Sequence, residues 1–197
     1  MKQKIKPAPK RPSRAAAEKA VRTLIEWVGE NPGREGLRGT PQRVVRAFEE
    51  YFSGYKLDAK DVLGKTFIEA GGYDGPVLVK DLALESRCEH HLAPFSGRIH
   101  IAYIPDGRVV GLSKLSRLVD VYASRMQTQE RLTAEISDAL HKHLKPKGVA
   151  VMIEAEHFCM KIRGVYEDHA MTVTTRFLGA YKKNAGLREE FLLQVKG

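Results

Sequence analysis

Both cysteines of the chain lie next to histidines, in the segments Cys88-Glu89-His90-His91 and His157-Phe158-Cys159. Cys88 and His91 have the C-x-x-H spacing that lets two side chains of one tight loop bind the same ion. His157 and Cys159 are two positions apart, so on an extended strand they are predicted to face the same way. Zinc prefers thiolate and imidazole ligands, and a catalytic zinc takes three of them and leaves a fourth position for water. The two segments therefore predict a catalytic zinc site.

The residues leave more than one ligand set open. Cys88, His91 and Cys159 are favoured, because adjacent residues of an extended loop tend to diverge, but His90 or His157 could replace His91. Imidazoles that do not bind the metal would be available for proton transfer beside a metal-bound water. The alternatives are a structural zinc with four protein ligands, a disulfide, or two inert buried cysteines.

Composition is that of a cytosolic globular protein. The chain has 197 residues, of which 43% are hydrophobic, and no apolar run approaches the length of a membrane span. The N-terminus is basic and Pro-rich without the apolar region of a secretory signal, so we expect a cytoplasmic protein with reduced thiols. The net charge is +9, but six basic and no acidic residues lie in positions 1–14. The excess thus belongs mainly to a solvated tail, and nucleic acid and membrane are not expected as partners.

The periodicity of apolar residues predicts an α+β fold. Helical spacing in 21–28 and 44–52 indicates a helical hairpin, and residues 77–84 are predicted to form a strand. Alternation in 99–103, followed by a turn and a return strand at 109–110, indicates a β-hairpin. Residues 86–96 are expected to form the loop that holds the Cys-Glu-His-His run. Helices are predicted from Ser113 and over 128–144, then strands over 149–155 and 171–178 and a short helix over 187–195. We expect a basic disordered tail (1–14), a helical arm (15–60) and a catalytic domain (61–197).

Three further segments carry charges that could bind a nucleotide. Ser113 is predicted to cap a helix whose first turn carries Lys114 and Arg117, and free N–H groups with two cations suit a phosphate. Glu130 could accept hydrogen bonds from the adjacent N–H and NH2 donors of guanine, although a glutamate in the first turn of a helix also complements the helix dipole. Arg163 and Arg43 are weaker phosphate candidates. Taken singly, the segments at Ser113 and Glu130 are better explained as ordinary helix starts, and Arg163 is equally compatible with a surface arginine.

Several motifs, in the same order and at the same spacing, resemble those of the GTP cyclohydrolase I family. They are the segments 86–95, 100–105, 111–114, 127–133, 157–160 and 163–165, and the resemblance runs from about Ala15 to the C-terminus. Arg87 and Ala93 depart from the residues frequent in the family, at positions without a functional role. The resemblance implies the tunnelling fold, an antiparallel four-stranded sheet with two helices on one face, preceded here by the helical hairpin.

The resemblance also implies an activity and an assembly. The family hydrolyses GTP to 7,8-dihydroneopterin triphosphate and formate, the first step of pterin and tetrahydrofolate biosynthesis, as a homodecamer with active sites at subunit interfaces. It carries one zinc per subunit on the positions matching Cys88, His91 and Cys159. We expect water activated at the zinc to attack C8 of guanine. Folate, biopterin and deazaguanine pathways share this step.

The remaining site residues follow from the same resemblance. His157 is expected to protonate N7 as the imidazole ring opens, with His90 and Ser113 near the sugar. The substrate-binding set is Gln129, Glu130, Lys114, Arg117, Arg163 and Arg43, the last from a neighbouring chain. Two other functions compete with this one: that of a nitrile-reducing relative that uses a cysteine nucleophile and NADPH without zinc, and that of a zinc module that binds RNA. The paired Cys and His residues argue against the first, and aromatic residues that fall on apolar stripes argue against the second.

Overall fold

The computed structural model describes residues 10–64, 66–68 and 72–196, which divide into two compact units, one ending at Glu50 and one beginning at Tyr51. In the first unit, α1 (Arg14–Trp27) and α2 (Thr40–Tyr51) form the predicted helical hairpin, and Arg14 near the start of α1 pairs with Glu49 of α2 at 3.4 Å. Most of the predicted disordered tail lies outside the described residues. Among the described residues, no helix combines the length and apolar composition that crossing a membrane requires.

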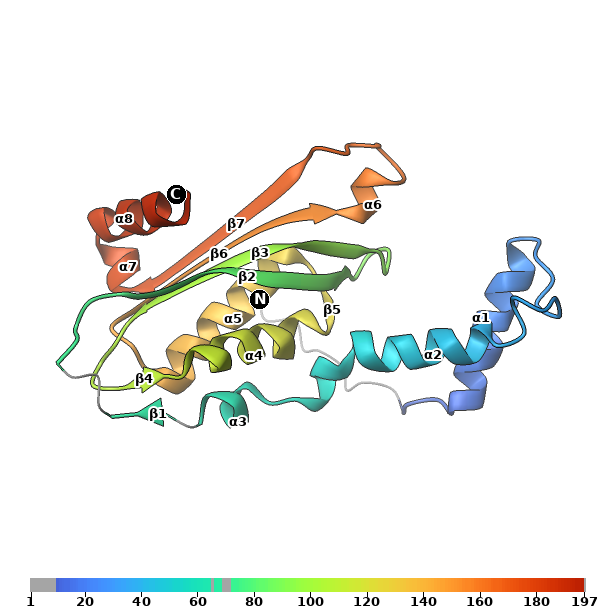
Figure 1. Cartoon of the computed structure of the whole chain (residues 1–197), viewed down its shortest axis with the longest axis horizontal. Coiled ribbons are helices and arrows are strands. Elements are labelled where there is room, and N and C mark those ends of the chain that lie inside the picture. The colour runs from blue at the N-terminus through green and yellow to red at the C-terminus, as the bar shows by residue number, and fades with distance from the viewer. Residues whose placement is uncertain (1–9, 65, 69–71, 197) are drawn as a thin grey trace, which may run out of the picture. The chain divides into compact units, whose positions relative to one another are not determined.

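The second unit contains the remaining helices and strands (Figure 1). In chain order they are η1 (Ser53–Lys56), α3 (Ala59–Leu63), β1 (Thr66–Phe67), β2 (Val77–Cys88), β3 (Pro94–Ile104), β4 (Val109–Val110), α4 (Leu112–Ala123), β5 (Met126–Gln127), α5 (Gln129–Leu144), β6 (Gly148–His157), α6 (Phe158–Lys161), β7 (Met171–Gly179), α7 (Ala180–Lys183) and α8 (Ala185–Lys196).

The main sheet has the strand order β5-β2-β3-β6-β7. Strands β2, β3, β6 and β7 are antiparallel, and only the two-residue strand β5 runs parallel to its neighbour β2. Helices α4 and α5 cover one face of this sheet (Figure 1). The expected α+β fold, with four antiparallel strands and two helices on one face, is therefore confirmed, and β5 adds a short fifth strand at one edge.

The alternation of side chains along the central strands builds two separate cores. Ile99 and Ile101 of β3 point toward α4 and α5 and are fully buried with Leu115, Leu118 and Ile136. Their neighbour Ala102 faces the other way, into a smaller cluster with Ala150, Met152, Tyr181 and Phe191 beneath α7 and α8. Because both faces are covered, the second half of β3 is buried almost continuously, and the sheet is a rigid support for the residues at its far end.

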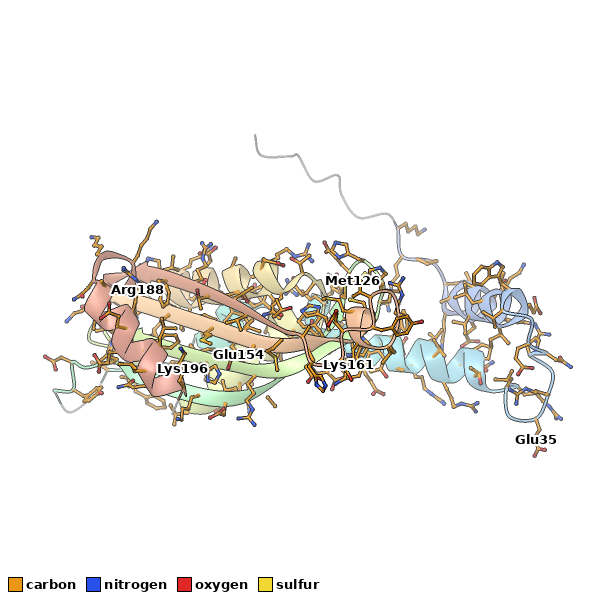
Figure 2. The ribbon with its side chains drawn as sticks, turned by 90° about the horizontal axis from the view of Figure 1, so that it is seen from above. Glu35, Met126, Glu154, Lys161, Arg188 and Lys196 are labelled. Atoms are coloured by element: carbon orange, nitrogen blue, oxygen red, sulfur yellow. The ribbon has the colours of Figure 1, made fainter. Side chains whose placement is uncertain are left out.

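The face that carries α8 also contains a cavity of about 480 Å³. Figure 2 looks onto this face and shows Glu154 of β6 beside Lys196 at the end of α8. This cavity lies on the opposite side of the sheet from α4 and α5, and it shares no lining residue with the pocket around the cysteines.

The predicted β-hairpin between residues 99–103 and 109–110 is wrong. β4 pairs with β1 through Thr66↔Val110 and Phe67↔Val109, and the hairpin partner of β3 is β2. The reason is that both edges of β3 are already occupied, by β2 on one side and β6 on the other, so that the chain after the turn at Gly107 has to leave the main sheet.

Candidate active site

The Cys-Glu-His-His run forms the tight turn of the β2–β3 hairpin. β2 continues to Cys88, and the backbone N–H of Cys88 donates to Ala93 O at 2.9 Å, while Leu92 N donates back to Cys88 O at 2.8 Å. The expected loop over 86–96 is therefore too long, since Ser86 and Arg87 are paired with Phe95 and Pro94 in the sheet. The sequence does not indicate that the strand continues to Cys88, because Ser86 and Arg87 are polar and resemble loop residues. In the structure Ser86 is buried, and its hydroxyl donates to Ala123 O.

Cys159 approaches this turn from a helix. β6 ends at His157, and Phe158–Lys161 form the single helical turn α6. The expectation that His157 and Cys159 share one face of an extended strand is therefore wrong. The helical turn sends the two side chains to different partners: Cys159 lies with Cys88, whereas His157 contacts Gln129 of α5.

Cys88, His91 and Cys159 are arranged to hold a metal ion. One ligand atom from each lies within 4.8 Å of the other two, and Cys88 Sγ is 4.0 Å from His91 Nδ1. In the part of the chain that the structure describes, no other group of three or more His, Cys, Asp or Glu side chains meets this condition. In a tetrahedral zinc site the ligand atoms lie roughly 3.5–3.8 Å apart, so only a small contraction is needed. Both cysteines are free thiols, and a disulfide is not observed.

The environment of the thiols suits a cation. Burial raises the pKa of the Cys159 thiol, the nearby Cys88 raises it further, and the charge of Arg163 opposes the shift. The thiolates of Cys88 and Cys159 would repel each other, because their sulfur atoms lie within 4.8 Å. A divalent cation between them would offset this electrostatic repulsion. The donor set of two sulfurs and one imidazole nitrogen therefore fits a zinc ion.

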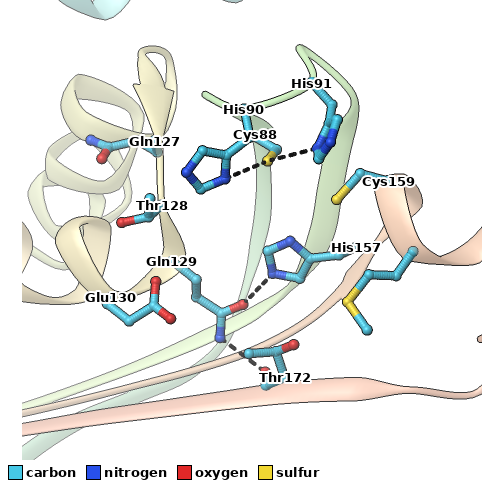
Figure 3. A pocket seen from close by; sticks show the side chains of 11 residues that line it. Cys88, His90, His91, Gln127, Thr128, Gln129, Glu130, His157, Cys159 and Thr172 are labelled. Atoms are coloured by element: carbon cyan, nitrogen blue, oxygen red, sulfur yellow. Dashed lines mark hydrogen bonds between the residues drawn. The ribbon is translucent and has the colours of Figure 1, made fainter. Parts of the chain in front are cut away.

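The candidate metal ligands Cys88, His91 and Cys159 line a pocket of about 250 Å³. Figure 3 shows His90 beside Cys88, with its Nδ1 at 3.7 Å from the sulfur, and His157 below them. Glu130 lines the same pocket from the first turn of α5. Burial lowers the pKa of His157, and the negative charge of Glu130 opposes that shift. A metal site, two further imidazoles and a carboxylate thus converge on one cavity.

Comparison with known proteins identifies the family to which this site belongs. The family model described as GTP cyclohydrolase I matches residues 17–196.

The chain belongs to the GTP cyclohydrolase I family.

Two relatives named GTP cyclohydrolase 1 are similar over nearly the whole chain. The protein from Allorhizobium ampelinum is 50% identical over 193 residues, 98% of this chain and 96% of the relative. The protein from Brucella canis is 52% identical over 187 residues, 95% of this chain and 88% of the relative. A solved structure, the archaeosine synthase QueF-Like in the apo form, has a TM-score of 0.44 and 20% identity, covering 53% of this chain and 94% of that chain. The resemblance drawn from the sequence is confirmed by the first two relatives and the family model, and with it the expectation of a GTP cyclohydrolase I enzyme.

Some of the residues expected from the family resemblance lie away from the pocket. Ser113 and Lys114 lie in the first turn of α4 and Arg117 lies half-way along it, whereas the C-terminal end of α4 is beside the pocket, where Tyr122 O accepts from Gln127. Along the helix axis Ser113 is roughly 15 Å and Arg117 roughly 9 Å from that end, and none of the three lines the pocket. Ser113 is also not the cap: the N-cap is Gly111, and Ser113 is the second residue of the helix.

The two remaining arginines differ in their surroundings. Arg163 follows α6 and is exposed, close enough to Cys159 for its charge to act on the thiol. Arg43 lies in the first compact unit, where its guanidinium donates to Gly36 O at 2.9 Å and to Thr40 Oγ1 at 2.8 Å.

Four further residues line the pocket, namely Gln127, Thr128, Met160 and Thr172, and the sequence assigns none of them a role. Gln127, Thr128 and Met160 belong to motifs shared with the family, which is the signal that could have found them. Thr172 comes from β7, a strand that the sequence predicts but does not connect to the candidate metal site.

Proposed function

We propose that this chain is a zinc-dependent enzyme that converts GTP to 7,8-dihydroneopterin triphosphate and formate, the first step of pterin and tetrahydrofolate biosynthesis. GTP cyclohydrolase I activity is the activity of the family to which it belongs. The observation that carries the proposal is the convergence of Cys88, His91 and Cys159 with His157 and Glu130 on one pocket.

Cys88, His91 and Cys159 would hold one zinc ion per subunit. Three protein ligands leave one of four coordination positions for water, as catalytic zinc sites require. A zinc ion in this place supplies a Lewis acid that makes water nucleophilic near neutral pH. Among the described residues of one chain, no fourth His, Cys, Asp or Glu joins the group of Cys88, His91 and Cys159. This favours a site with an open position over a closed structural site.

Glu130 would recognise the base. Its carboxylate accepts hydrogen bonds, and guanine presents two adjacent donors, N1–H and the 2-amino group, whereas adenine presents no such pair there. A carboxylate left without donors in a closed pocket costs on the order of a few kcal/mol, which would exclude adenine nucleotides. With this edge on Glu130, the imidazole ring of guanine is directed toward the cysteines.

His157 and His90 would move the protons of the reaction. His157 lines the pocket and in Figure 3 lies between Gln129 and the two cysteines, and we assign it the protonation of N7 as the ring opens. His90, on the same turn as the metal ligands, would act with Ser113 near the ribose during its rearrangement.

The site of one chain is small for a nucleoside triphosphate. Its volume of about 250 Å³ lies below the range of roughly 300–1,000 Å³ usual for small-molecule sites. Lys114, Arg117 and Ser113 do not line the pocket of their own chain. We therefore propose that a second copy supplies Lys114 and Arg117 for the triphosphate, together with Arg163 and, from a further neighbour, Arg43. A homodecamer with interfacial sites fits this requirement, and the exposed edge of β7 is suited to pairing with a strand of another copy.

We place the enzyme in the cytoplasm, because two unpaired thiols used as metal ligands need a reducing compartment. GTP is its substrate, and neither nucleic acid nor membrane is proposed as a partner.

The proposal is tested by incubating the full-length protein with GTP and measuring formate together with the absorbance and fluorescence of the pterin. The account expects both products in equal amounts, their loss after treatment with a chelator, and their return with added zinc. Absence of formate from a protein that contains zinc and is folded would refute it.

A further inference from the structure

Gln129 is buried and its amide is held in one orientation. The side chain is 1% exposed, and its Nε2 lies 3.2 Å from Ile153 O, 2.9 Å from Thr172 O and 3.1 Å from Thr174 Oγ1. Two of these partners are carbonyl oxygens, which can only accept hydrogen bonds. The amide nitrogen must therefore face them, since a flipped amide would place oxygen against oxygen. Strands β6 and β7 thus fix the direction of the Gln129 side chain.

The fixed amide determines which nitrogen of His157 carries a hydrogen. Gln129 Oε1 lies 2.8 Å from His157 Nε2, and an amide oxygen only accepts. His157 Nε2 must then donate, so the neutral ring has its hydrogen on Nε2 and its lone pair on Nδ1. In Figure 3 the second ring nitrogen is on the side away from Gln129, directed toward Cys88 and the turn that carries His91.

Phe95 fixes the plane of the same ring. The rings of Phe95 and His157 are stacked, with centroids 4.7 Å apart and an interplanar angle of 7°. The two residues are direct partners in the register of β3 and β6, and Phe95 is fully buried. The position, plane and hydrogen placement of the imidazole are therefore all set by the protein before any substrate binds.

We propose that Gln129 is a positioning residue, which holds His157 with its hydrogen on Nε2 so that Nδ1 is the atom that exchanges a proton with the substrate. This inference rests on the proposed function and deepens it by naming the proton-transferring atom. It differs from the role expected from the family resemblance, in which Gln129 binds the substrate directly. The observation behind the difference is that the amide hydrogens of Gln129 are already used by β6 and β7.

The proton balance of the step is simple. The His157 cation has hydrogens on both nitrogens. The Nδ1–H bond breaks, its electron pair stays on Nδ1, and a new N–H bond forms at N7 of the opening guanine ring. The neutral imidazole that remains is the one Gln129 favours, with Nε2–H still donating to Oε1. Proton loss from Nε2 would instead leave two lone pairs facing each other at 2.8 Å, so this alternative is disfavoured.

A double-mutant cycle separates this role from substrate binding. Gln129→Met keeps the size of the side chain but removes its hydrogen-bonding groups, and we expect kcat to fall roughly 10–100-fold while KM for GTP changes less than about twofold. In the background of His157→Ala, Gln129→Met should cause no further loss, because its effect acts through the imidazole. Zinc content and thermal unfolding of each variant serve as controls for metal binding and folding. An increase in KM at constant kcat, or losses that add in the double variant, would overturn the proposal.

A second measurement does not depend on turnover and uses a variant only to assign signals. Solid-state NMR of the zinc-loaded, full-length protein labelled with 15N-histidine reports which ring nitrogen carries hydrogen, and His157→Gln identifies the His157 signals among the seven histidines. At about pH 8, above the ordinary pKa of imidazole, we expect a protonated Nε2 and a bare Nδ1. Hydrogen on Nδ1, or an equal mixture of both forms, would refute the proposal. Because this spectrum is recorded without GTP, it remains decisive even if the protein makes no formate, a result that would count against the proposed function alone.

Discussion

Glu89 and Arg131 form an ion pair with a distance of 2.7 Å between Oε2 and Nη2, which ties the turn between β2 and β3 to the first turn of α5. Arg131 Nε also donates to Gln127 Oε1 at 2.8 Å, and the Glu89 backbone N–H donates to Gln127 O at 2.9 Å. The turn that carries two of the three metal-binding residues is thus held by side chains that do not themselves bind metal. Such supporting contacts commonly decide how well a metal site is preorganised.

Arg131→Met should therefore weaken zinc binding by about 10–100-fold, the effect typical of losing an outer contact of a metal site. Competition with a chromophoric chelator measures this affinity. Arg125→Met is the matched control, since Arg125 donates to Gly54 O and Leu57 O rather than to the turn. Equal zinc affinities for the two variants would show that the ion pair has no part in the site.

His91→Ala should abolish formate production and reduce the zinc content of the purified protein, because only two sulfur ligands remain. His91 is exposed, so the variant is expected to fold and to unfold at a temperature close to that of the original protein. His169→Ala provides the control, as His169 is also exposed and contacts only Asp168 among the ion pairs of the described residues. Full zinc occupancy in His91→Ala would remove His91 from the ligand set and return His90 or His157 to consideration.

Glu130→Gln should reduce discrimination between guanine and other bases. The amide offers one acceptor in place of a charged pair of oxygens, so we expect kcat/KM for GTP to fall by about 10–100-fold, equivalent to roughly 1.4–2.7 kcal/mol. Inosine triphosphate, which lacks the 2-amino group, should lose much less. The surface substitution Glu189→Gln on α8 controls for the change of charge. A proportional loss for both nucleotides would contradict the assignment of Glu130 to the base edge.

The sequence was sufficient for most strands and helices and for the candidate metal group of Cys88, His91 and Cys159, because these follow from local spacing. Cys88 and His91 share one turn, and the alternation around Ile99 and Ile101 predicts a strand, although the structure buries both of its faces there. The four-residue helix α6 could not be foreseen, since four residues do not contain a period of their own. Its consequence is large, because it separates the direction of Cys159 from that of His157.

The rest of the site depends on contacts between distant segments. A glutamine in the first turn of a helix normally faces solvent. Gln129 is instead buried, because α5 packs against β6 and β7 and the Gln129 amide donates to carbonyl oxygens of both strands. Ser113, Lys114 and Arg117 show the converse: the family resemblance suggests a common site, but none of the three lines the pocket within one chain. No pattern in a single sequence indicates which copy of a chain supplies a residue.

Tyr181 makes stability sensitive to alkali. Burial raises the pKa of its hydroxyl to about 12, and the charge of Glu190 adds to the shift. The folded pKa is above the ordinary value near 10, so the contribution of the neutral hydroxyl is complete below pH 10 and is lost as the pH rises toward 12. The difference corresponds to at most about 2–3 kcal/mol.

Tyr181→Phe should accordingly lose less stability than the original protein between pH 10 and 12, while the two should be similar near pH 7. Urea unfolding at a series of pH values measures this difference. Tyr166→Phe is the control, because Tyr166 is 72% exposed, and it should follow the original protein throughout. Parallel curves for Tyr181→Phe and the original protein would contradict the effect of burial at this position.

X-ray absorption at the zinc edge tests the central claim most directly, namely that this chain holds one zinc ion with three protein ligands and an open position. For the full-length protein as purified, we predict about one zinc per chain, coordinated by two sulfur atoms near 2.3 Å and by two lighter atoms near 2.0–2.1 Å, one an imidazole nitrogen and the other a solvent oxygen. A second imidazole in place of solvent, or a folded and active protein without zinc, would contradict the account.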